Sequence, residues 1–278
     1  MAMVALQVGQ FGNAVGSATL KLLSEAPQRD GALFHSDGKA RAVLVDGEAK
    51  VVDAILRERG SIYRPENAVV EASGRGNNWA LGYHGPRGAG GNALVDRAME
   101  GMRRELEACD SHAGCVVMHS LCGGSGSGVG SRLLEEVRDA IGSRALLSVS
   151  VLPFAAGEMP LQSYNTTLCL SRVAAEADAS ILFSNDEMLA LCARRAAPRT
   201  GSVARPVDVA ATKVGVADLN AAIAESLAGL LLPTSGSGRR DAAVPFDPAS
   251  LVADVAPLKE AMFLDLWGVS EHQARATA

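Results

Sequence analysis

The fold is decided by residues 114–141, which read GCVVMHSLCGGSGSGVGSRLLEEVRDAI. A short apolar run ends at His119, a glycine-rich turn spans residues 123–130, and an amphipathic run continues to Ile141. Glycines let backbone N–H groups approach an anion closely, and the amino end of a following helix adds positive charge. The stretch therefore predicts a strand, an anion-binding loop and a helix.

Three interpretations of the glycine loop can be compared. A Walker A loop needs Lys and then Ser or Thr after its last glycine, whereas Val129 follows Gly128, so that interpretation fails. A dinucleotide loop needs G-x-G-x-x-G after the first strand, but here glycines occupy every second position from 124 to 130, in the middle of the chain. A glycine loop without a ligand is the third alternative, and the strand and helix around the loop favour a phosphate site over it.

The rest of the chain alternates short apolar runs with helical stretches. Strands are expected at 3–8, 41–46, 67–71, 114–119, 146–152 and 180–184. Helices are expected at 92–109, at 129–141, and from Asp218 to a stop at Pro233. Such alternation predicts a doubly wound α/β fold with a mostly parallel sheet.

Composition excludes several classes of protein. The 278 residues are 48% hydrophobic and 21% charged, which is typical of a globular protein with a sizeable core. A net charge of −5 argues against a nucleic-acid binder, which needs a surplus of basic residues. The five cysteines lack metal-ligand spacing, so we expect reduced thiols. No basic leader and no run of roughly 18 apolar residues is present, so we expect a cytosolic protein without a membrane span.

Three regions are expected along the chain. Residues 1–232 form the nucleotide-binding domain, residues 233–247 a linker, and residues 248–278 part of a second domain with a polar tail. The linker is indicated by the Gly, Ser and charged residues of TSGSGRRDAA at 234–243. The last region includes a β-like run at 261–267 and is too short to form a core of its own.

Six motifs in order resemble the eukaryotic tubulin family. They are LQVGQFGNAVG (6–16), RAVLVDGEAKVVD (41–53), GRGNNWALGY (74–83), HSLCGGSGSGVGS (119–131), SYNTTLCLSRVAAEADASILFSNDEML (163–189) and VADLNAAIAESLAGLL (216–231). The sequence resembles δ-tubulin most, through FSNDEML (183–189) and LAGLLLPT (227–234), with ε-tubulin as runner-up. The resemblance implies a tubulin-type GTPase domain and a C-terminally truncated second domain.

The resemblance also implies a ligand and a set of contacts, with GTP or GDP and Mg²⁺ as cofactors. The nucleotide contacts that it implies are Gly9, Gln10, Phe11, Asn77, Ser120, Gly123, Gly124, Ser125, Gly126, Glu158, Asn185 and Asn220. Glu158 falls on the ribose position, and Asn185 and Asn220 on the guanine edge. The implied metal residues are Gln10, Asp46 and Glu48, of which the two carboxylates would hold Mg²⁺ through water. Trp79 is expected to pack beside the loop rather than on the base.

Several residues depart from the family pattern. Phe11 replaces a Cys, Gln162 an acidic residue at the ribose, and Val216 an aromatic ring on guanine. Loss of base stacking costs on the order of 1 kcal/mol, so weaker nucleotide binding is expected. Ser250 stands where the family's catalytic carboxylate would be, near the acidic Asp247, and Ser does not orient water as a charged base does. No catalytic residue is therefore assigned, and at most a weak GTPase that requires a partner subunit is expected.

The resemblance implies a structural component of centriolar, basal-body or axonemal microtubules. Its partners would be other tubulin-family subunits or centriolar proteins, with no nucleic acid or membrane. It would be located in the cytoplasm and cytoskeleton, at a centriole, basal body or cilium. The alternative is a non-polymerising pseudo-GTPase regulator that binds tubulin-like partners. A dinucleotide-dependent enzyme is disfavoured by the glycine spacing.

Overall fold

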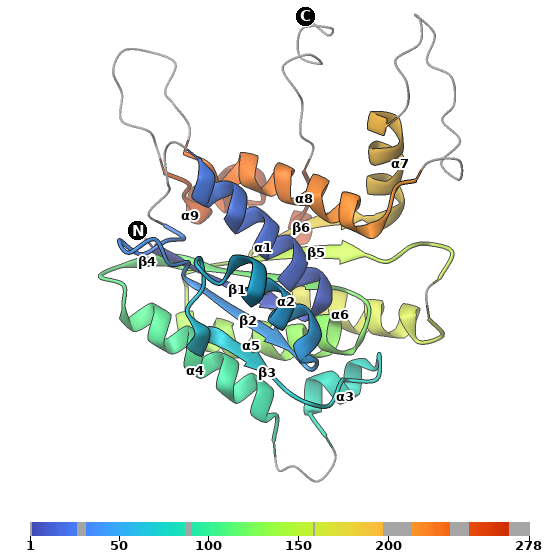
Figure 1. The fold of residues 1–278 in the computed structure, drawn as a ribbon, viewed down its shortest axis with the longest axis horizontal. Coiled ribbons are helices and arrows are strands. Elements are labelled where there is room, and N and C mark those ends of the chain that lie inside the picture. Colours follow the sequence, from blue (N-terminus) through green and yellow to red (C-terminus); the bar gives the residue numbers. More distant parts are fainter. Residues whose placement is uncertain are drawn as a thin grey trace, which may run out of the picture.

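The chain folds around one parallel sheet. The computed structural model describes residues 2–26, 32–86, 91–157, 159–196, 213–233 and 245–266. The strands are β1 (Ala2–Val8), β2 (Ala42–Asp46), β3 (Ala68–Val70), β4 (His112–Ser120), β5 (Ala145–Leu152), β6 (Ala179–Ser184) and β7 (Phe263–Asp265). They pair in the order β3-β2-β1-β4-β5-β6-β7, and every pair is parallel (Figure 1). The predicted α/β fold with a parallel sheet is confirmed.

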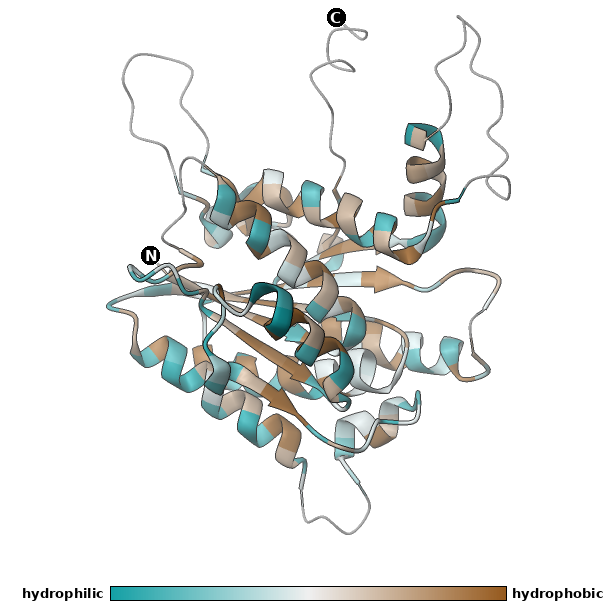
Figure 2. Cartoon of the chain, viewed as in Figure 1, coloured by the Kyte–Doolittle hydropathy of each residue, from teal (hydrophilic) through white to brown (hydrophobic). Residues whose placement is uncertain are grey.

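The strands are buried on both faces, which explains their near-continuous apolar sequences. Every residue of β1 and β2 is buried. Because side chains alternate along a strand, Met3 and Ala5 enter the core on one face, while Val4 and Leu6 enter the core on the other. The sheet therefore separates two hydrophobic cores, and Figure 2 shows its strands as the most apolar part of the fold.

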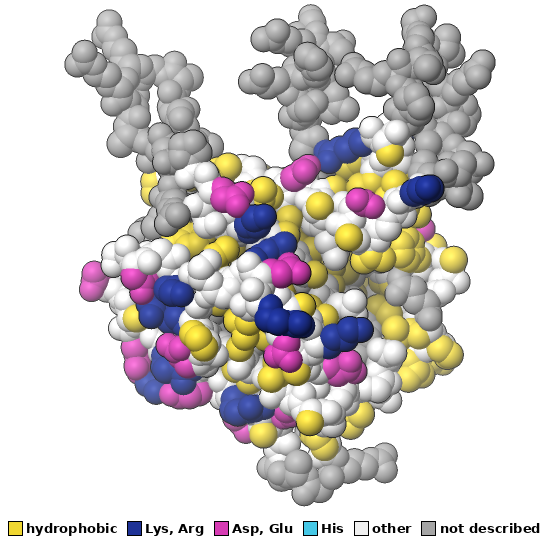
Figure 3. Space-filling view, viewed as in Figure 1, with side chains coloured by type: hydrophobic (Ala, Val, Ile, Leu, Met, Phe, Trp, Pro, Cys, Tyr) yellow, Lys and Arg dark blue, Asp and Glu magenta, His cyan; other side chains and the backbone are white. Residues whose placement is uncertain are grey.

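Helices cover both faces of this sheet. One face carries α1 (Gly9–Glu25), α2 (Ala49–Arg59), α7 (Asn185–Ala196), α8 (Val216–Leu231) and α9 (Pro248–Val255). The other carries α3 (Trp79–His84), α4 (Ala93–Glu107), α5 (Gly130–Ile141) and α6 (Gln162–Glu176). Shorter turns are η1 (Pro65–Asn67), η2 (Gly124–Val129) and η4 (Lys259–Ala261). Acidic and basic side chains are interspersed over the face drawn in Figure 3.

Some boundaries differ from the sequence prediction. The strand expected at 67–71 is only three residues long, because Asn67 closes η1 and turns its amide to Ala42 O and Glu105. The helix expected from Asp218 begins at Val216, since Asp218 Oδ2 accepts a hydrogen bond from Gly215 N at 2.8 Å. The linker motif at 234–243 lies outside the described residues. β7, expected in a separate fragment, pairs with β6 in the main sheet.

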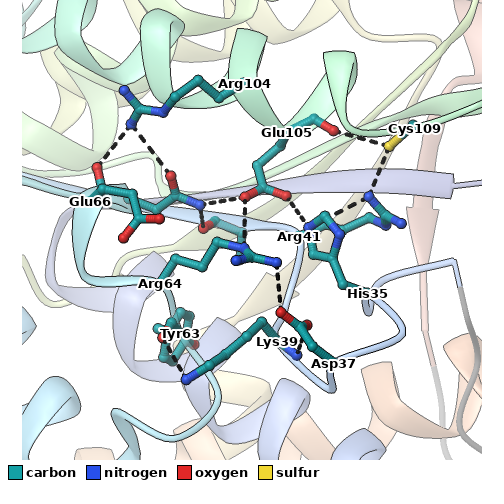
Figure 4. A network of polar contacts seen from close by, with 12 residues as sticks. His35, Asp37, Lys39, Arg41, Tyr63, Arg64, Glu66, Arg104, Glu105 and Cys109 are labelled. Carbon is teal, nitrogen blue, oxygen red and sulfur yellow. Dashed lines mark hydrogen bonds and ion pairs between the residues drawn. The ribbon is translucent and has the colours of Figure 1, made fainter.

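A polar network ties the amino ends of the strands together (Figure 4). At its centre is Glu105 of α4, which is 3% exposed. Its Oε2 lies 2.6 Å from His35 Nε2, and its Oε1 accepts a hydrogen bond from Asn67 Nδ2 at 2.7 Å. Arg41 Nη1 donates to Cys109 Sγ at 3.0 Å. The network joins the segment before β2 to the segment before β4, and so closes the edge of the sheet opposite the glycine loop.

The five cysteines, all within the described ranges, form no disulfide and are thiols, as expected. Within the described ranges, no helix is both long and apolar enough to cross a bilayer.

Candidate functional site

Four loops meet at the carboxyl ends of the strands. They follow β1 at Gly9, β2 at 46–48, β3 at 71–78 and β4 at 120–130. Because β3, β2, β1 and β4 are neighbours and parallel, these loops share one edge of the sheet, where ligands of open α/β folds bind. The order of the strands thus brings together motifs that are far apart in the sequence.

The loop after β4 has the geometry of an anion cradle. Gly123 has a positive φ of 86°, and residues 124–129 form a π-helical turn that continues into α5. The Ser127 hydroxyl donates to Gly123 O, and Cys122 N donates to Ser120 Oγ at 3.1 Å. The first N–H groups of such a turn have no acceptor within the helix, so they are available to a phosphate. π-turns of this kind are frequent at functional sites.

The first loop lies directly against the glycine loop. Gly9 has φ +72°, and a Cβ built on it would lie 2.8 Å from Gly126 N. A side chain at Gly9 would therefore push the two loops apart, and a Cβ on Gly126 would crowd Ser120, whose O would lie 3.0 Å away. Gln10 is exposed in the first turn of α1, whereas Phe11 is partly buried against the core beside it. Gly9 and Gly126 thus form a narrow cradle, in which the positive φ and the close backbone contact favour glycine at position 9.

The acidic loop after β2 is linked to the same cradle. Gly47 N donates to Ser125 Oγ at 3.3 Å, and Glu48 N donates to Asp46 Oδ1 at 3.4 Å. Asp46 is 6% exposed, and this burial raises the pKa of its carboxyl group, while the Ser125 hydroxyl and the loop N–H groups oppose the rise. Glu48 is exposed. Two carboxylates therefore stand at the rim of the cradle.

This pair fits a hard cation that keeps most of its water. Among the described residues, no group of three or more His, Cys, Asp or Glu side chains is arranged to hold a metal. Mg²⁺ typically uses one or two carboxylates together with phosphate oxygens and water. Asp46 and Glu48 therefore fit a magnesium ion that arrives with a phosphorylated ligand.

The loop after β3 bends over the glycine loop. Gly76 and Asn77 have positive φ values of 53° and 50°. Asn77 Oδ1 lies 3.8 Å from the place that a Cβ on Gly123 would take. Asn165 of α6 fixes the end of the loop, since its Nδ2 donates to Asn77 O at 2.8 Å and its Oδ1 accepts from Trp79 N at 3.0 Å. The bend places the Asn77 side chain over the start of the cradle.

Trp79 packs beside the loop, in agreement with the expectation from sequence. It is 9% exposed, and its Nε1 donates to Ser131 Oγ at 2.9 Å. Its ring stacks on Tyr83 with the centroids 4.6 Å apart. The indole therefore supports α3 against α5.

The two residues predicted for the base lie on α7 and α8. Asn185 begins α7 directly after β6, and Asn220 lies in the second turn of α8. These helices contact each other, since Cys192 Sγ lies 3.6 Å from Asp218 O. Val216, which begins α8, is 61% exposed. Glu158 lies outside the described residues, so its predicted ribose contact stays a prediction.

The Gln162 side chain contacts the loop that precedes its own helix, α6. Its Nε2 donates to Phe154 O at 2.8 Å, which fixes the segment between β5 and α6. This contact gives the side chain a local role in holding the loop. Its predicted place at the ribose stays a prediction.

Three buried residues near the cradle were missed from the sequence. Asn165 holds the Asn77 bend, and Arg75 lies under the meeting point of the loops at 2% exposure. His119 is completely buried below Gly130. A buried polar residue inside a quoted motif was the available signal for Asn165 and Arg75. His119, the first residue of the motif at 119–131, offered the same signal.

Fold and site together define an α/β domain of the nucleotide-binding class, in which the glycine loop follows the fourth strand. The sequence model of the Tubulin/FtsZ family, GTPase domain, matches residues 2–193. The chain belongs to this family.

Curated relatives are tubulin β chains. The tubulin beta-1 chain of Colletotrichum graminicola is 36% identical over 211 residues, which cover 68% of this chain and 46% of that one. The tubulin beta chain of Porphyra purpurea is 34% identical, with 68% and 45% covered. That of Aspergillus fumigatus (strain ATCC MYA-4609 / CBS 101355 / FGSC A1100 / Af293) is 33% identical over 213 residues, with 69% and 47% covered. The chain thus spans about half the length of the curated relatives it matches.

GTPase domains of this family bind GTP or GDP with Mg²⁺. The residues present here fit such a ligand, because the Gly9 and Gly126 cradle has no room for a Cβ and two carboxylates stand at its rim. A bound nucleotide would supply the phosphoanhydride whose hydrolysis the family performs.

Proposed function

We propose that this chain binds GTP or GDP with Mg²⁺ and is a tubulin-like structural protein. The observation that carries the proposal is the contact of Gly9 with Gly126, together with the hydrogen bond from Gly47 N to Ser125 Oγ. These contacts join the first, second and fourth loops into one cradle at the edge of the sheet. A cradle of backbone N–H groups with acidic residues at its rim suits a phosphate chain that carries a divalent cation.

Each predicted site residue has a proposed role. The phosphates are bound by Gly9, Gln10, Phe11, Asn77, Ser120, Gly123, Gly124, Ser125 and Gly126. Asn185 and Asn220 read the guanine edge, because a carboxamide both donates and accepts hydrogen bonds. Glu158 contacts the ribose, and Gln10, Asp46 and Glu48 surround the water shell of Mg²⁺.

Hydrolysis is proposed to be weak or absent. Ser250 Oγ donates to Asp247 Oδ2 at 2.8 Å, so both side chains serve the amino end of α9. Beyond this helix, Met262 O accepts from Ser180 N at the start of β6, which puts the segment at the amino ends of the strands. A residue there is remote from the chain's own phosphate loop. It could act only on a neighbour's nucleotide, where Ser lacks the basicity of a carboxylate.

The particular member that we propose is δ-like, with ε-tubulin as runner-up. The support is FSNDEML at 183–189 and LAGLLLPT at 227–234. A δ-like member would be part of centriolar, basal-body or axonemal microtubules in the cytoskeleton, with tubulin-family subunits or centriolar proteins as partners. We place the boundary of the nucleotide domain at 232, the linker at 233–247 and the partial second domain at 248–278.

The alternative is a pseudo-GTPase regulator that binds tubulin-like partners without polymerising. Two observations favour it: Val216 offers the base no aromatic ring, and Ser250 offers no catalytic carboxylate. Both departures weaken the link between nucleotide turnover and assembly.

Titration of the full chain with GTP and GDP, with and without Mg²⁺, tests the nucleotide proposal. We expect Mg²⁺ to tighten GTP binding, and Glu48→Gln to reduce that gain by about tenfold, which corresponds to about 1.4 kcal/mol. Glu58→Gln is the matched control, since Glu58 is exposed on α2, which begins directly after Glu48. Failure of the unaltered chain to bind either nucleotide at millimolar concentration would overturn the proposal.

A further inference from the structure

Arg75 lies where three loops of the candidate site meet. Its side chain is only 1% exposed. The Arg75 Cβ is 2.5 Å from the place that a Cβ on Gly124 would take, and its Cγ is 3.5 Å from the corresponding place on Gly47. The aliphatic part of the arginine therefore lies directly against both the phosphate loop and the acidic loop.

The guanidinium group fastens the loop after β3. Its Nη2 donates to Glu71 Oε2 at 2.7 Å and lies 3.5 Å from Asn92 Oδ1, while Nη1 donates to Ser73 O at 3.3 Å. We call Arg75, Glu71 and Asn92 the arginine clamp. Both partners are themselves anchored, since Glu71 N donates to Asp46 O at 3.2 Å and Asn92 Nδ2 donates to Gly82 O at 2.7 Å. The clamp thus connects the end of β2 with α3 and the start of α4.

A charge this deeply buried is costly unless it is paired. Arg75 has its closest carboxylate partner in Glu71, and its buried Nε has no hydrogen-bond partner among the described residues. Removing the Glu71 charge would leave Arg75 buried without this carboxylate, whereas removing Arg75 would leave Glu71, which is 18% exposed, with Arg97 at 3.7 Å. The ion pair between Arg75 and Glu71 therefore restrains the loop after β3.

The clamp acts together with Asn165 on the position of Asn77. Asn78 N donates to Arg75 O at 3.0 Å, so the left-handed bend at Gly76 and Asn77 is closed on Arg75 itself. The bend carries the Asn77 side chain over Gly123. If Arg75 moved, Asn77 would lose this position.

The same loop closes over the cation side of the cradle. A Cβ on Gly74 would collide with the Glu48 carboxylate, so the loop lies against one of the two candidate magnesium residues. In nucleoside triphosphate sites, Mg²⁺ bridges oxygens of the β- and γ-phosphates. The terminal phosphate of a triphosphate would therefore lie under the loop that the clamp holds, whereas a diphosphate lacks this group.

We propose that the arginine clamp positions loop 71–78 on the terminal phosphate, and that Arg75 is a positioning residue that makes the site prefer a nucleoside triphosphate over a diphosphate. This inference rests on the proposed nucleotide binding. Arg75 acts through Asn77 and Asn78 and does not contact the phosphate.

Titration of the full chain with Mg²⁺-GTP and Mg²⁺-GDP tests the preference. Arg75→Gln and Glu71→Gln are each expected to weaken GTP binding by about tenfold and to change GDP binding by less than about twofold. Arg97→Gln is the matched control, because Arg97 also pairs with Glu71, at 3.7 Å, but is 53% exposed and donates its other hydrogen bonds to Ala93 O and Val70 O. Retained GDP binding shows that each variant is folded.

Two outcomes of this titration would overturn the inference. One is an equal loss for GTP and GDP, which would make Arg75 a general structural residue. The other is a loss of GTP binding in Arg75→Gln with a gain in Glu71→Gln. The latter would mean that a released Arg75 binds the phosphate directly.

Amide hydrogen exchange of the nucleotide-free chain gives a second readout. Residues 71–78 should exchange faster in Arg75→Gln and Glu71→Gln than in the unaltered chain or Arg97→Gln, since the clamp holds the loop before any ligand binds. Unchanged exchange would disprove the clamp. If the unaltered chain bound neither nucleotide, the proposed function would fail, whereas the exchange rates would still decide whether the clamp exists.

Discussion

His119 is a buried histidine beneath the glycine loop. Its Nε2 lies 3.1 Å from both Ser148 Oγ and Ser150 Oγ, and its Nδ1 lies 3.8 Å from Cys169 Sγ. Burial lowers the pKa of this imidazole from its ordinary value of 6.5 to about 4, although backbone contacts at Ser120 and Gly126 oppose the shift. At neutral pH the ring is therefore uncharged. It lies between the serines of β5 and Cys169 of α6.

Folding stability should fall as the pH falls below 6.5. Between the folded and unfolded pKa values the unfolded chain binds more protons, so acid favours unfolding. From about pH 7.5 to 5.5 we expect a loss of about 1.4 kcal/mol in the free energy of unfolding from this residue. Urea unfolding at the two pH values measures it. His119→Gln should remove the loss, and His84→Gln, at an exposed position, should retain it. An identical pH dependence in both variants would refute the assignment.

At the scale of elements, α3 and the π-helical turn depend on backbone contact. A Cβ on Gly128 would lie 2.7 Å from Gly82 Cα and 2.9 Å from Tyr83 N, and it would also collide with Trp79 O. These neighbours are backbone atoms, so they cannot relieve the clash by a change of side-chain rotamer. The absence of a side chain at Gly128 is therefore what lets α3 lie against the phosphate turn.

Gly128→Ala should destabilise the chain by about 1–3 kcal/mol, as overpacking of a closely packed contact does. Gly229→Ala is the opposite control. Gly229 is exposed within α8, and nothing lies within 4 Å of the place that a Cβ on it would take, so alanine should stabilise the helix by about 0.5–1 kcal/mol. Thermal unfolding of the two variants checks both signs. A neutral Gly128→Ala would mean that α3 does not depend on this contact.

At the scale of the whole molecule, the two edges of the sheet have different roles. The carboxyl edge carries the four loops of the candidate site. The amino edge is closed by the Glu105 network of Figure 4 and by Lys259, which donates to Ala177 O at the end of α6. A tubulin-like subunit that binds nucleotide at one edge and a neighbour at the other would use both.

Co-sedimentation with microtubules separates the two candidate functions. For a structural subunit, the amount of this chain in the pellet should increase with the amount of microtubule polymer. For a regulator, the chain should stay in the supernatant, bound to tubulin dimers at a fixed ratio. Sedimentation of the chain alone corrects for aggregation. Glu48→Gln should reduce pelleting if assembly depends on Mg²⁺-GTP. Absence of the chain from every microtubule pellet would contradict the structural function.

The sequence by itself determined the fold and the location of the glycine loop. Apolar runs, glycine spacing and helical periodicity are local properties, so they predicted the parallel sheet and a strand, loop and helix at 114–141. It placed strand ends less well: Asn67 leaves β3 because its amide binds Glu105, 38 positions away. A local sequence pattern carries no information about a hydrogen-bond partner that far along the chain.

Only the tertiary structure decided how the site is held together. Asn165 binds Trp79 N across 86 positions, Arg75 reaches Asn92 across 17, and His35 meets Glu105 across 70. Taken alone, each of these side chains could have been an ordinary surface residue. Their roles follow from the order of the parallel strands, which brings distant loops to one edge and buries polar groups that must then be paired.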